Sequence, residues 1–272
     1  MILAFFRYWL ETVQEYTMPR FISYVGDIDV SRRILEIGPL TEPIFIKHEA
    51  NIFYADIRST DEVKKLYAKD PSVNVDNICS IDFVIKDSYE KSLIHVDKFD
   101  YVVSSHVLEH VPRIIEFFQD IATILNKDGM LYFVLPDHRY CFDHFRVPTS
   151  FAEAYFIHSQ DIKIPPWRVF DAALEYISLN DPRRLWSKDG IAKETLSRRN
   201  TFENAVKALD QVLEGQYVDA HFSVFSPKSF VLLLYNMINA RLFPFRCTAF
   251  YPTEKIATTL PLSFNYARRC YR

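Results

Sequence analysis

The feature that most constrains this chain is an apolar run, 32-RRILEIGPL-40, that reaches Glu36 and then Gly38. A second apolar run, 52-IFYAD-56, closes on Asp56. A buried strand that stops at a carboxylate and a glycine turns sharply into a helix, and an acid about twenty residues later can hold the hydroxyls of a ribose. The pattern therefore predicts that two neighbouring strands bind a nucleoside-containing cofactor.

Short apolar runs and amphipathic stretches alternate along the chain, as they do in βαβ units. Near-continuous apolar runs suit parallel strands buried on both faces, and the expected strands are 33–38, 52–57, 78–83, 99–105, 130–135, 245–252 and 258–268. Helices are expected at 59–70, 112–125, 201–215 and 228–240, with a turn at 126–129. The first helix begins with Ser59 and Glu62 in the spacing of a capping box.

The same pattern divides the chain into four parts. Residues 1–30 are expected to form an N-terminal helical segment, residues 31–146 the cofactor-binding half of one domain, and residues 218–272 its C-terminal half. Between the halves, four prolines break residues 147–217 into short helical pieces. This predicts a helical insertion or lid over the active edge of the sheet.

Composition narrows the class of protein. The formal net charge is only −3 at pH 7, which gives no electrostatic argument for a nucleic-acid partner. The four cysteines are scattered without a CxxC pair, and this favours reduced thiols and a cytoplasmic location. The apolar N-terminus is interrupted by Arg7, Glu11 and Glu15 and is too short to span a bilayer. We therefore expect an amphipathic helix there and no stable membrane insertion.

A dinucleotide-binding turn requires glycines where 38-GPLTEP-43 has Leu40 and Pro43, so a nicotinamide cofactor loses support. The order of motifs instead resembles the class I S-adenosylmethionine-dependent methyltransferases. The resemblance rests on Glu36 and Gly38, Asp56, the pair Asp82-Phe83, 99-FDYVVSSHVLEHVP-112 and 125-LNKDGMLYFVLPD-137. It implies an α/β, Rossmann-like methyltransferase sheet of seven strands, mostly parallel with the last strand antiparallel, and S-adenosylmethionine as the cofactor.

Farther along, 136-PDHRYCFDHFR-146 and 217-YVDAHFSVFSPKSF-230 resemble a bacterial subgroup of that superfamily that accompanies glycosyltransferases and surface-polysaccharide genes. This implies O-methylation of a saccharide or another small polar or anionic acceptor in polysaccharide or capsule biosynthesis, and association with glycosyltransferases. The alternative is a methyltransferase-like module that has lost catalysis and serves as a scaffold in glycan assembly. Leu40 in the glycine loop is its main support, because a side chain there could crowd the carboxylate of the cofactor. A nucleotide-sugar or nicotinamide enzyme is a third option.

The resemblance also assigns roles at the cofactor site. Glu36 is expected near the methionine ammonium and Asp56 at the ribose hydroxyls. Asp82 is expected at the adenine amino group, with Phe83 packed on the ring. The other expected cofactor-binding residues follow the bend and the strand ends, and they are Gly38, Pro39, Ile57, Ser105 and His106.

His106, Glu109 and His110 match the HxxEH signature of inverted zinc peptidases. That chemistry needs both histidines on one sustained helix, whereas here a strand ends near Ser105 and Pro112 follows closely. We therefore expect no metal at this motif. Glu109 and His110 are expected to fix a turn, and His106 to face the cofactor or acceptor.

The stretch 137–146 follows the fifth strand and therefore lies at the rim where ligands collect in parallel sheets. Neutral imidazole can accept the proton of an attacking hydroxyl, and arginine can hold a carboxylate or phosphate with paired donors. The candidate catalytic residues are His138, His144, His221 and Asp143, where Asp137 or Asp143 orients the imidazole and Asp219-Ala-His221 is a second dyad. The candidate acceptor-binding residues are Arg139, Tyr140, Arg146 and Trp167. An alternative role for Arg146 is to pair with Asp143 only to hold the loop.

Overall fold

The computed structural model describes residues 28–71, 73–178, 185, 196–253 and 259–266. Its sheet has the strand order β3-β2-β1-β4-β5-β7-β6. The strands are β1 (Ile34–Ile37), β2 (Ile52–Asp56), β3 (Phe83–Val84), β4 (Phe99–Ser105), β5 (Leu125–Pro136), β6 (Phe245–Phe250) and β7 (Thr259–Tyr266). Strands β1 to β5 pair in parallel, and β7 runs antiparallel to both β5 and β6. The predicted α/β, Rossmann-like fold with a mostly parallel sheet is confirmed.

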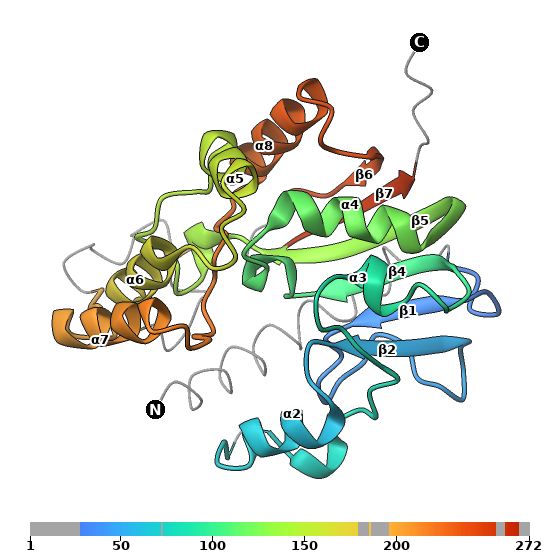
Figure 1. Ribbon diagram of the computed structural model, residues 1–272, viewed down its shortest axis with the longest axis horizontal. Coiled ribbons are helices and arrows are strands. Elements are labelled where there is room, and N and C mark those ends of the chain that lie inside the picture. Colours follow the sequence, from blue (N-terminus) through green and yellow to red (C-terminus); the bar gives the residue numbers. More distant parts are fainter. Residues whose placement is uncertain (1–27, 72, 179–184, 186–195, 254–258, 267–272) are drawn as a thin grey trace.

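Alternate residues of the central strands enter two separate apolar layers, as the two-residue period of a strand requires. One layer contains Val102 and Phe133 together with helices α4 (Ile114–Ile124) and α8 (Pro227–Asn239). The other contains Val103 and Val134 on the opposite face of the sheet. The alternation explains why these strands read as continuous apolar runs: both of their faces are covered (Figure 1).

Two helix starts follow directly from the sequence. Helix α2 (Thr60–Tyr67) begins with the predicted capping box, in which the Ser59 amide donates to Glu62 at 2.8 Å and the Glu62 amide donates back to the Ser59 hydroxyl. Helix α8 begins at Pro227 with Ser226 as its cap. Each cap satisfies a backbone amide that the first helical turn leaves without a partner.

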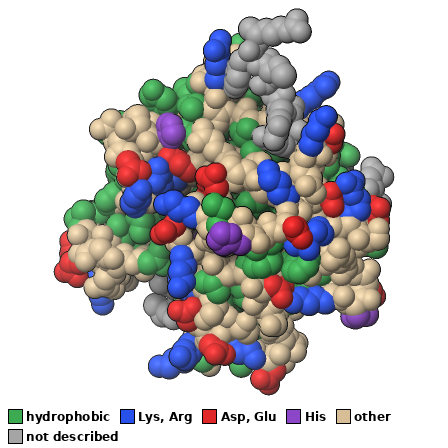
Figure 2. Space-filling view, turned by 45° about the vertical axis from the view of Figure 1, so that its right-hand side comes forward, with side chains coloured by type: hydrophobic (Ala, Val, Ile, Leu, Met, Phe, Trp, Pro, Cys, Tyr) green, Lys and Arg blue, Asp and Glu red, His purple; other side chains and the backbone are tan. Residues whose placement is uncertain are grey.

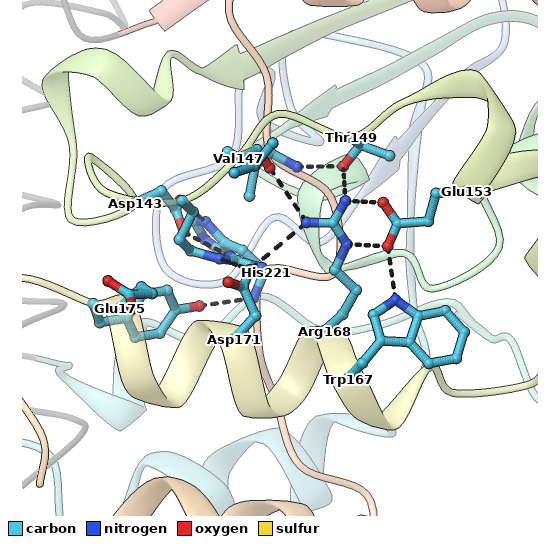
Figure 3. A network of polar contacts seen from close by, with 12 residues as sticks. Asp143, Val147, Thr149, Glu153, Trp167, Arg168, Asp171, Glu175 and His221 are labelled. Carbon is cyan, nitrogen blue, oxygen red and sulfur yellow. Dashed lines mark hydrogen bonds and ion pairs between the residues drawn. The ribbon is translucent and has the colours of Figure 1, made fainter. Parts of the chain in front are cut away.

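The segment between the two halves of the sheet contains helices α5 (Phe151–Ser159), α6 (Pro166–Glu175) and α7 (Phe202–Leu213). Figure 1 shows α6 and α7 beyond the carboxyl ends of β1 and β4. Polar contacts join α6 to α5, because Arg168 and Trp167 both bond to Glu153, and Arg168 also reaches Thr149 (Figure 3). Trp167 therefore helps to hold two helices together, and its expected role in binding the acceptor stays a prediction.

The structure corrects two expected elements. Residues 78–82 of the expected strand 78–83 are not in a strand, because Ile78 packs in a small cluster with Val63 of α2 and the Asp82 carboxylate accepts the Tyr54 amide at 2.8 Å. Strand β3 therefore consists only of Phe83–Val84. Residues 126–129 do not form a separate turn before the strand, because β5 already begins at Leu125. They form an irregularity inside β5: Leu125 pairs with β4, the next four residues do not, and the pairing resumes at Met130.

Charged side chains are distributed evenly over the face that Figure 2 shows, where basic and acidic groups alternate without a large patch of one sign. Within the described ranges, no helix combines the length and the apolar character needed to cross a membrane. The N-terminal helix expected over residues 1–19 lies outside the described residues.

Candidate functional site

A cavity of about 250 Å³ lies at the carboxyl ends of β1, β2 and β4. Its walls include Glu36 and Asp56, the two acids that the sequence singles out. The other expected cofactor residues that line it are Gly38, Pro39, Ile57, Ser105 and His106. Parallel strands expose their carboxyl ends on one edge, which explains why residues from three separate segments meet here.

Glu36 forms part of the cavity floor and is 2% exposed. Its carboxylate accepts the Ile44 amide at 2.8 Å and the Phe45 amide at 3.4 Å, and so closes the loop that begins at Gly38. Burial raises the pKa of Glu36 to about 8, although these two hydrogen bonds act in the opposite direction. A cation bound beside this carboxylate would favour its ionised form.

The bend after β1 requires glycine for two reasons. Gly38 has a φ of +67°, in the left-handed region that side chains disfavour. A Cβ there would lie 2.9 Å from Cγ2 of Val107, so the bend also brings β1 close to the segment after β4. Leu40 occupies the position where the methyltransferases that the sequence resembles have a second glycine. Its side chain packs against the apolar cluster around Val63 and also lines the cavity.

Asp56 ends β2 and is only partly exposed. Its Oδ1 accepts the Arg58 amide at 2.9 Å, and burial raises the pKa of the carboxyl group. The Arg58 guanidinium lies over the ring of Tyr217, 5.1 Å from its centroid. The segment after α7 therefore crosses the mouth of the cavity and meets the loop after β2.

Asp82 and Phe83 are not among the residues that line this cavity. The Asp82 carboxylate bonds to the Tyr54 amide and to Lys47, at 2.8 and 2.6 Å, and Phe83 packs against Phe53. These contacts use Asp82 to hold the edge of the sheet. The expectation that this pair binds adenine is corrected.

Three aromatic rings of the cavity wall were not predicted from the sequence: Tyr67, Tyr89 and Tyr217. They come from α2, α3 (Tyr89–Ser92) and the segment after α7, so no local motif connects them. The donor set fits an adenosine joined to an amino acid, since it combines a carboxylate at each end, a glycine bend and flat rings.

A second set of titratable groups, the acceptor-side cluster, adjoins the cavity and consists of Glu109, His110, Asp143, Asp219 and His221. His110 and Asp219 line the cavity, and Nδ1 of His110 lies 3.0 Å from Oδ1 of Asp219. Nδ1 of His221 lies 2.6 Å from Oδ2 of Asp143, and the two imidazole rings meet edge to face with centroids 4.6 Å apart.

Charge in this cluster perturbs several groups. Burial lowers the pKa of His110, but the charge and hydrogen bond of Asp219, together with the charges of Glu109 and Asp143, outweigh it and raise the pKa to about 9. Burial raises the pKa of Asp143, but His221 and Arg146 lower it well below its usual range. The pKa of Asp219 is lowered to about 2, because His110 outweighs the burial of the carboxylate.

These pairs correct the expected catalytic dyad. Asp219 and His221 do not pair with each other: Asp219 bonds to His110, and His221 bonds to Asp143. The side chain of Arg146 is fully buried and bonds to Asp143 at 2.7 Å and Asp171 at 2.8 Å. It therefore holds the loop, as the alternative stated, and cannot contact an acceptor.

The remaining acceptor-side candidates lie outside the walls of the cavity. His144 Nδ1 lies 2.7 Å from the Arg139 carbonyl oxygen, and the Arg139 side chain forms a paired bond with Asp137 and packs on Tyr140. Burial lowers the pKa of His138. Of the three histidines predicted to be catalytic, only His221 is connected to the cavity, through its contact with His110.

The fold and the site together define a Rossmann-like protein with a nucleoside cavity at the carboxyl ends of its strands. The family model for the methyltransferase domain matches residues 9–190, which is more than half of the 272 residues. The chain therefore belongs to the methyltransferase domain family. It is a methyltransferase, and its cofactor is S-adenosylmethionine.

Among solved structures, the chain is similar to an S-adenosylmethionine-dependent methyltransferase from Mesorhizobium loti, with 13% identity, 91% of this chain and 96% of that chain covered, and a TM-score of 0.44. It is also similar to the PH0226 protein from Pyrococcus horikoshii, with 13% identity, coverage of 96% and 92%, and a TM-score of 0.46. A Rhodobacter sphaeroides protein described as a Zn-dependent alcohol dehydrogenase has 13% identity, coverage of 96% and 96%, and a TM-score of 0.48. Likenesses of this strength decide nothing about activity. No curated protein matches the sequence.

Proposed function

We propose that this methyltransferase methylates an oxygen of a saccharide or of another small polar or anionic acceptor. When bound, S-adenosylmethionine supplies an activated methyl group on its sulfonium. The reacting groups must then be held in line with water excluded, which is the task of the cavity walls.

The residues that would hold the cofactor are those at the ends of β1, β2 and β4. Asp56 would accept hydrogen bonds from the ribose hydroxyls, and Glu36 would face the ammonium group. A buried carboxylate whose pKa is raised to about 8 gains most from a cation, because ammonium stabilises the ionised form that burial disfavours. Ser105 and His106 would line the methionine end of the cavity.

The observation that carries the acceptor proposal is the pair His110–Asp219 on the same cavity wall as Ser105 and His106. An imidazole with a pKa of about 9 carries a proton at neutral pH, so it donates to an acceptor oxygen or binds an anionic group. An anionic oxygen is attracted to this charge, whereas an amine that is protonated at neutral pH is repelled by it. The pair therefore favours an oxygen acceptor.

The polysaccharide setting, with glycosyltransferases as partners, rests on the resemblance of residues 136–146 and 217–230 to a bacterial subgroup. A cytoplasmic location is part of the same proposal, favoured by free Cys79, Cys141 and Cys247 among the described residues. Helices α5 to α7 would serve as the lid over the acceptor.

The test is methyl transfer from S-adenosylmethionine to a panel of simple sugars, uronic acids, nucleotide sugars and matched amino sugars. We expect turnover with hydroxyl or carboxylate acceptors and none with acceptors that offer only nitrogen. Exclusive methylation of nitrogen would contradict the proposal. Calorimetry with S-adenosylhomocysteine separates the scaffold alternative, because a module that has lost the cofactor site would release no heat.

A further inference from the structure

The acceptor-side cluster contains three potential metal ligands that no role above explains fully. Glu109, His110 and His221 each offer one ligand atom, and these atoms all lie within 4.8 Å of one another. Glu109 and His110 belong to the 3₁₀ helix Leu108–His110 directly after β4, and His221 comes from the segment after α7. Two imidazoles and one carboxylate at this separation are a common donor set for divalent transition metals.

Each imidazole is already oriented as a ligand would be. Asp219 lies 3.0 Å from Nδ1 of His110, and Asp143 lies 2.6 Å from Nδ1 of His221. A carboxylate on Nδ1 holds the proton of that nitrogen and orients the ring, so Nε2 is the atom that binds a metal ion, and the ion displaces any proton that Nε2 carries. Arg146 in turn holds Asp143 at 2.7 Å, so the second support is itself fixed.

Glu109 gives an independent reason to expect a cation. Its side chain is fully buried, and neither carboxylate oxygen accepts a hydrogen bond from the part of the chain that the structure describes. Nδ1 of His106 lies 3.4 Å from one of these oxygens, which is an ion-pair distance and longer than a charge-assisted hydrogen bond. Apart from this long contact with His106, the groups around the carboxylate are the imidazoles of His110 and His221, so a cation held among them would stabilise its ionised form.

We infer that Glu109, His110 and His221 form a binding site for one divalent first-row transition-metal ion at the acceptor side of the cofactor cavity. The HxxEH motif by itself predicts no such site, because His106 and His110 do not share a helix. The third ligand is instead His221, which lies far from the motif in the sequence. Only the tertiary structure brings it there.

The place of the site gives the ion a task, and this step rests on the proposed function. Three protein ligands leave coordination positions open, as in catalytic metal sites. His110 also lines the cavity, so an oxygen of the acceptor can occupy one of these positions. Such an ion would prefer an acceptor that offers two neighbouring oxygens, one of them from a hydroxyl or a carboxylate, because both oxygens can then bind it.

Metal binding can be measured without turnover. The full-length protein is treated with a chelator and dialysed against ZnCl₂, MnCl₂ or CoCl₂, and bound metal is counted per chain. We expect about one ion per chain, and visible absorption bands for cobalt that are typical of nitrogen ligands. His221→Ala and Glu109→Gln should each weaken binding by roughly tenfold or more.

His48→Ala is the matched control, because the His48 side chain is 77% exposed and pairs only with Glu49 among the described residues. It should bind metal as the unchanged protein does. Binding of S-adenosylhomocysteine, measured on each variant, shows that the cavity is folded; if Glu109→Gln fails to fold, His221→Ala decides alone.

No stoichiometric ion, or equal metal affinity in His221→Ala and His48→Ala, would overturn the inference. A parallel dialysis against MgCl₂ tests the choice of metal, and a preference for MgCl₂ over all three probes would overturn the choice of a transition metal. Metal binding without methyl transfer to oxygen would instead count against the proposed function and leave the site standing.

Discussion

The cofactor side and the acceptor side of the cavity are built in different ways. On the cofactor side, Glu36 and Gly38 are neighbours in sequence, and their partners, Ile44 and Phe45, lie within ten residues. On the acceptor side, His110 bonds to Asp219 and His221 bonds to Asp143, across 109 and 78 residues. The first side can be recognised from local motifs, whereas the second exists only once the chain has folded.

The two sides also differ in how charge is stabilised. Glu36 is a single buried carboxylate that backbone amides hold, and its pKa is raised. Asp143 is equally buried, but its partners His221 and Arg146 lower its pKa. Similar burial therefore has opposite consequences, because what decides the ionisation state is the partner.

The largest effect should come from Asp143→Ala. It leaves the Arg146 guanidinium buried beside Asp171 alone, and breaking a buried pair in this way destabilises by about 3–5 kcal/mol. Urea unfolding of the metal-free protein measures it. The control Arg32→Ala removes a surface pair with Asp100 and should lower stability by only about 0–1 kcal/mol. Equal losses would show that the acceptor side is not held by this pair.

Asp56→Ala should be next in size, and it acts on binding. Loss of two charge-assisted hydrogen bonds to the ribose is expected to weaken the binding of S-adenosylhomocysteine by about 3 kcal/mol, or roughly a hundredfold in affinity. Isothermal calorimetry provides the measurement. Asp82→Asn is the matched control, because Asp82 lies outside the cavity walls, and it should change the affinity little. If instead Asp82→Asn abolished binding, the original assignment of Asp82 would be restored.

Gly38→Ala should lower stability by about 2 kcal/mol, from left-handed backbone strain and from the clash with Val107. Gly215→Ala is the comparison, because Gly215 also has a positive φ but no atom within 4 Å of an added Cβ. It should lose only the strain, about 1 kcal/mol. Thermal unfolding of both variants measures the two losses of stability, and their difference is the cost of the contact between an added Cβ at position 38 and Val107. Equal losses of stability would mean that this contact costs nothing.

The last prediction concerns a slope, the pH dependence of stability. The pKa of Glu36 is raised in the folded state, so its contribution to stability is complete below about pH 4.5 and declines as the pH rises toward about 8. The slope is at most about 1.4 kcal/mol per pH unit. Glu36→Gln should remove that slope between pH 5 and 8. Parallel stability curves for the two proteins would contradict the burial argument.

The sequence predicted most of the fold because the signals that define it are local. The apolar runs locate β1, β2 and β4, and the capping residues Ser59 and Ser226 set where α2 and α8 begin. The third strand was placed wrongly, because 78-ICSIDF-83 has strand composition but its first residue packs against α2 and its aspartate bonds to a neighbouring strand. Such tertiary contacts override local propensity.

By itself, the sequence determined that this chain forms a parallel α/β sheet with two acids and a glycine bend at one cavity, because strand periodicity and turn chemistry are set by adjacent residues. The tertiary structure alone decided which carboxylate meets which imidazole. Asp143, Asp219 and His221 lie after β5 and α7, and the free energy of an ion pair depends on distance and burial, which sequence spacing does not encode. For that reason the sequence spacing did not indicate that His221 lies beside Glu109 and His110.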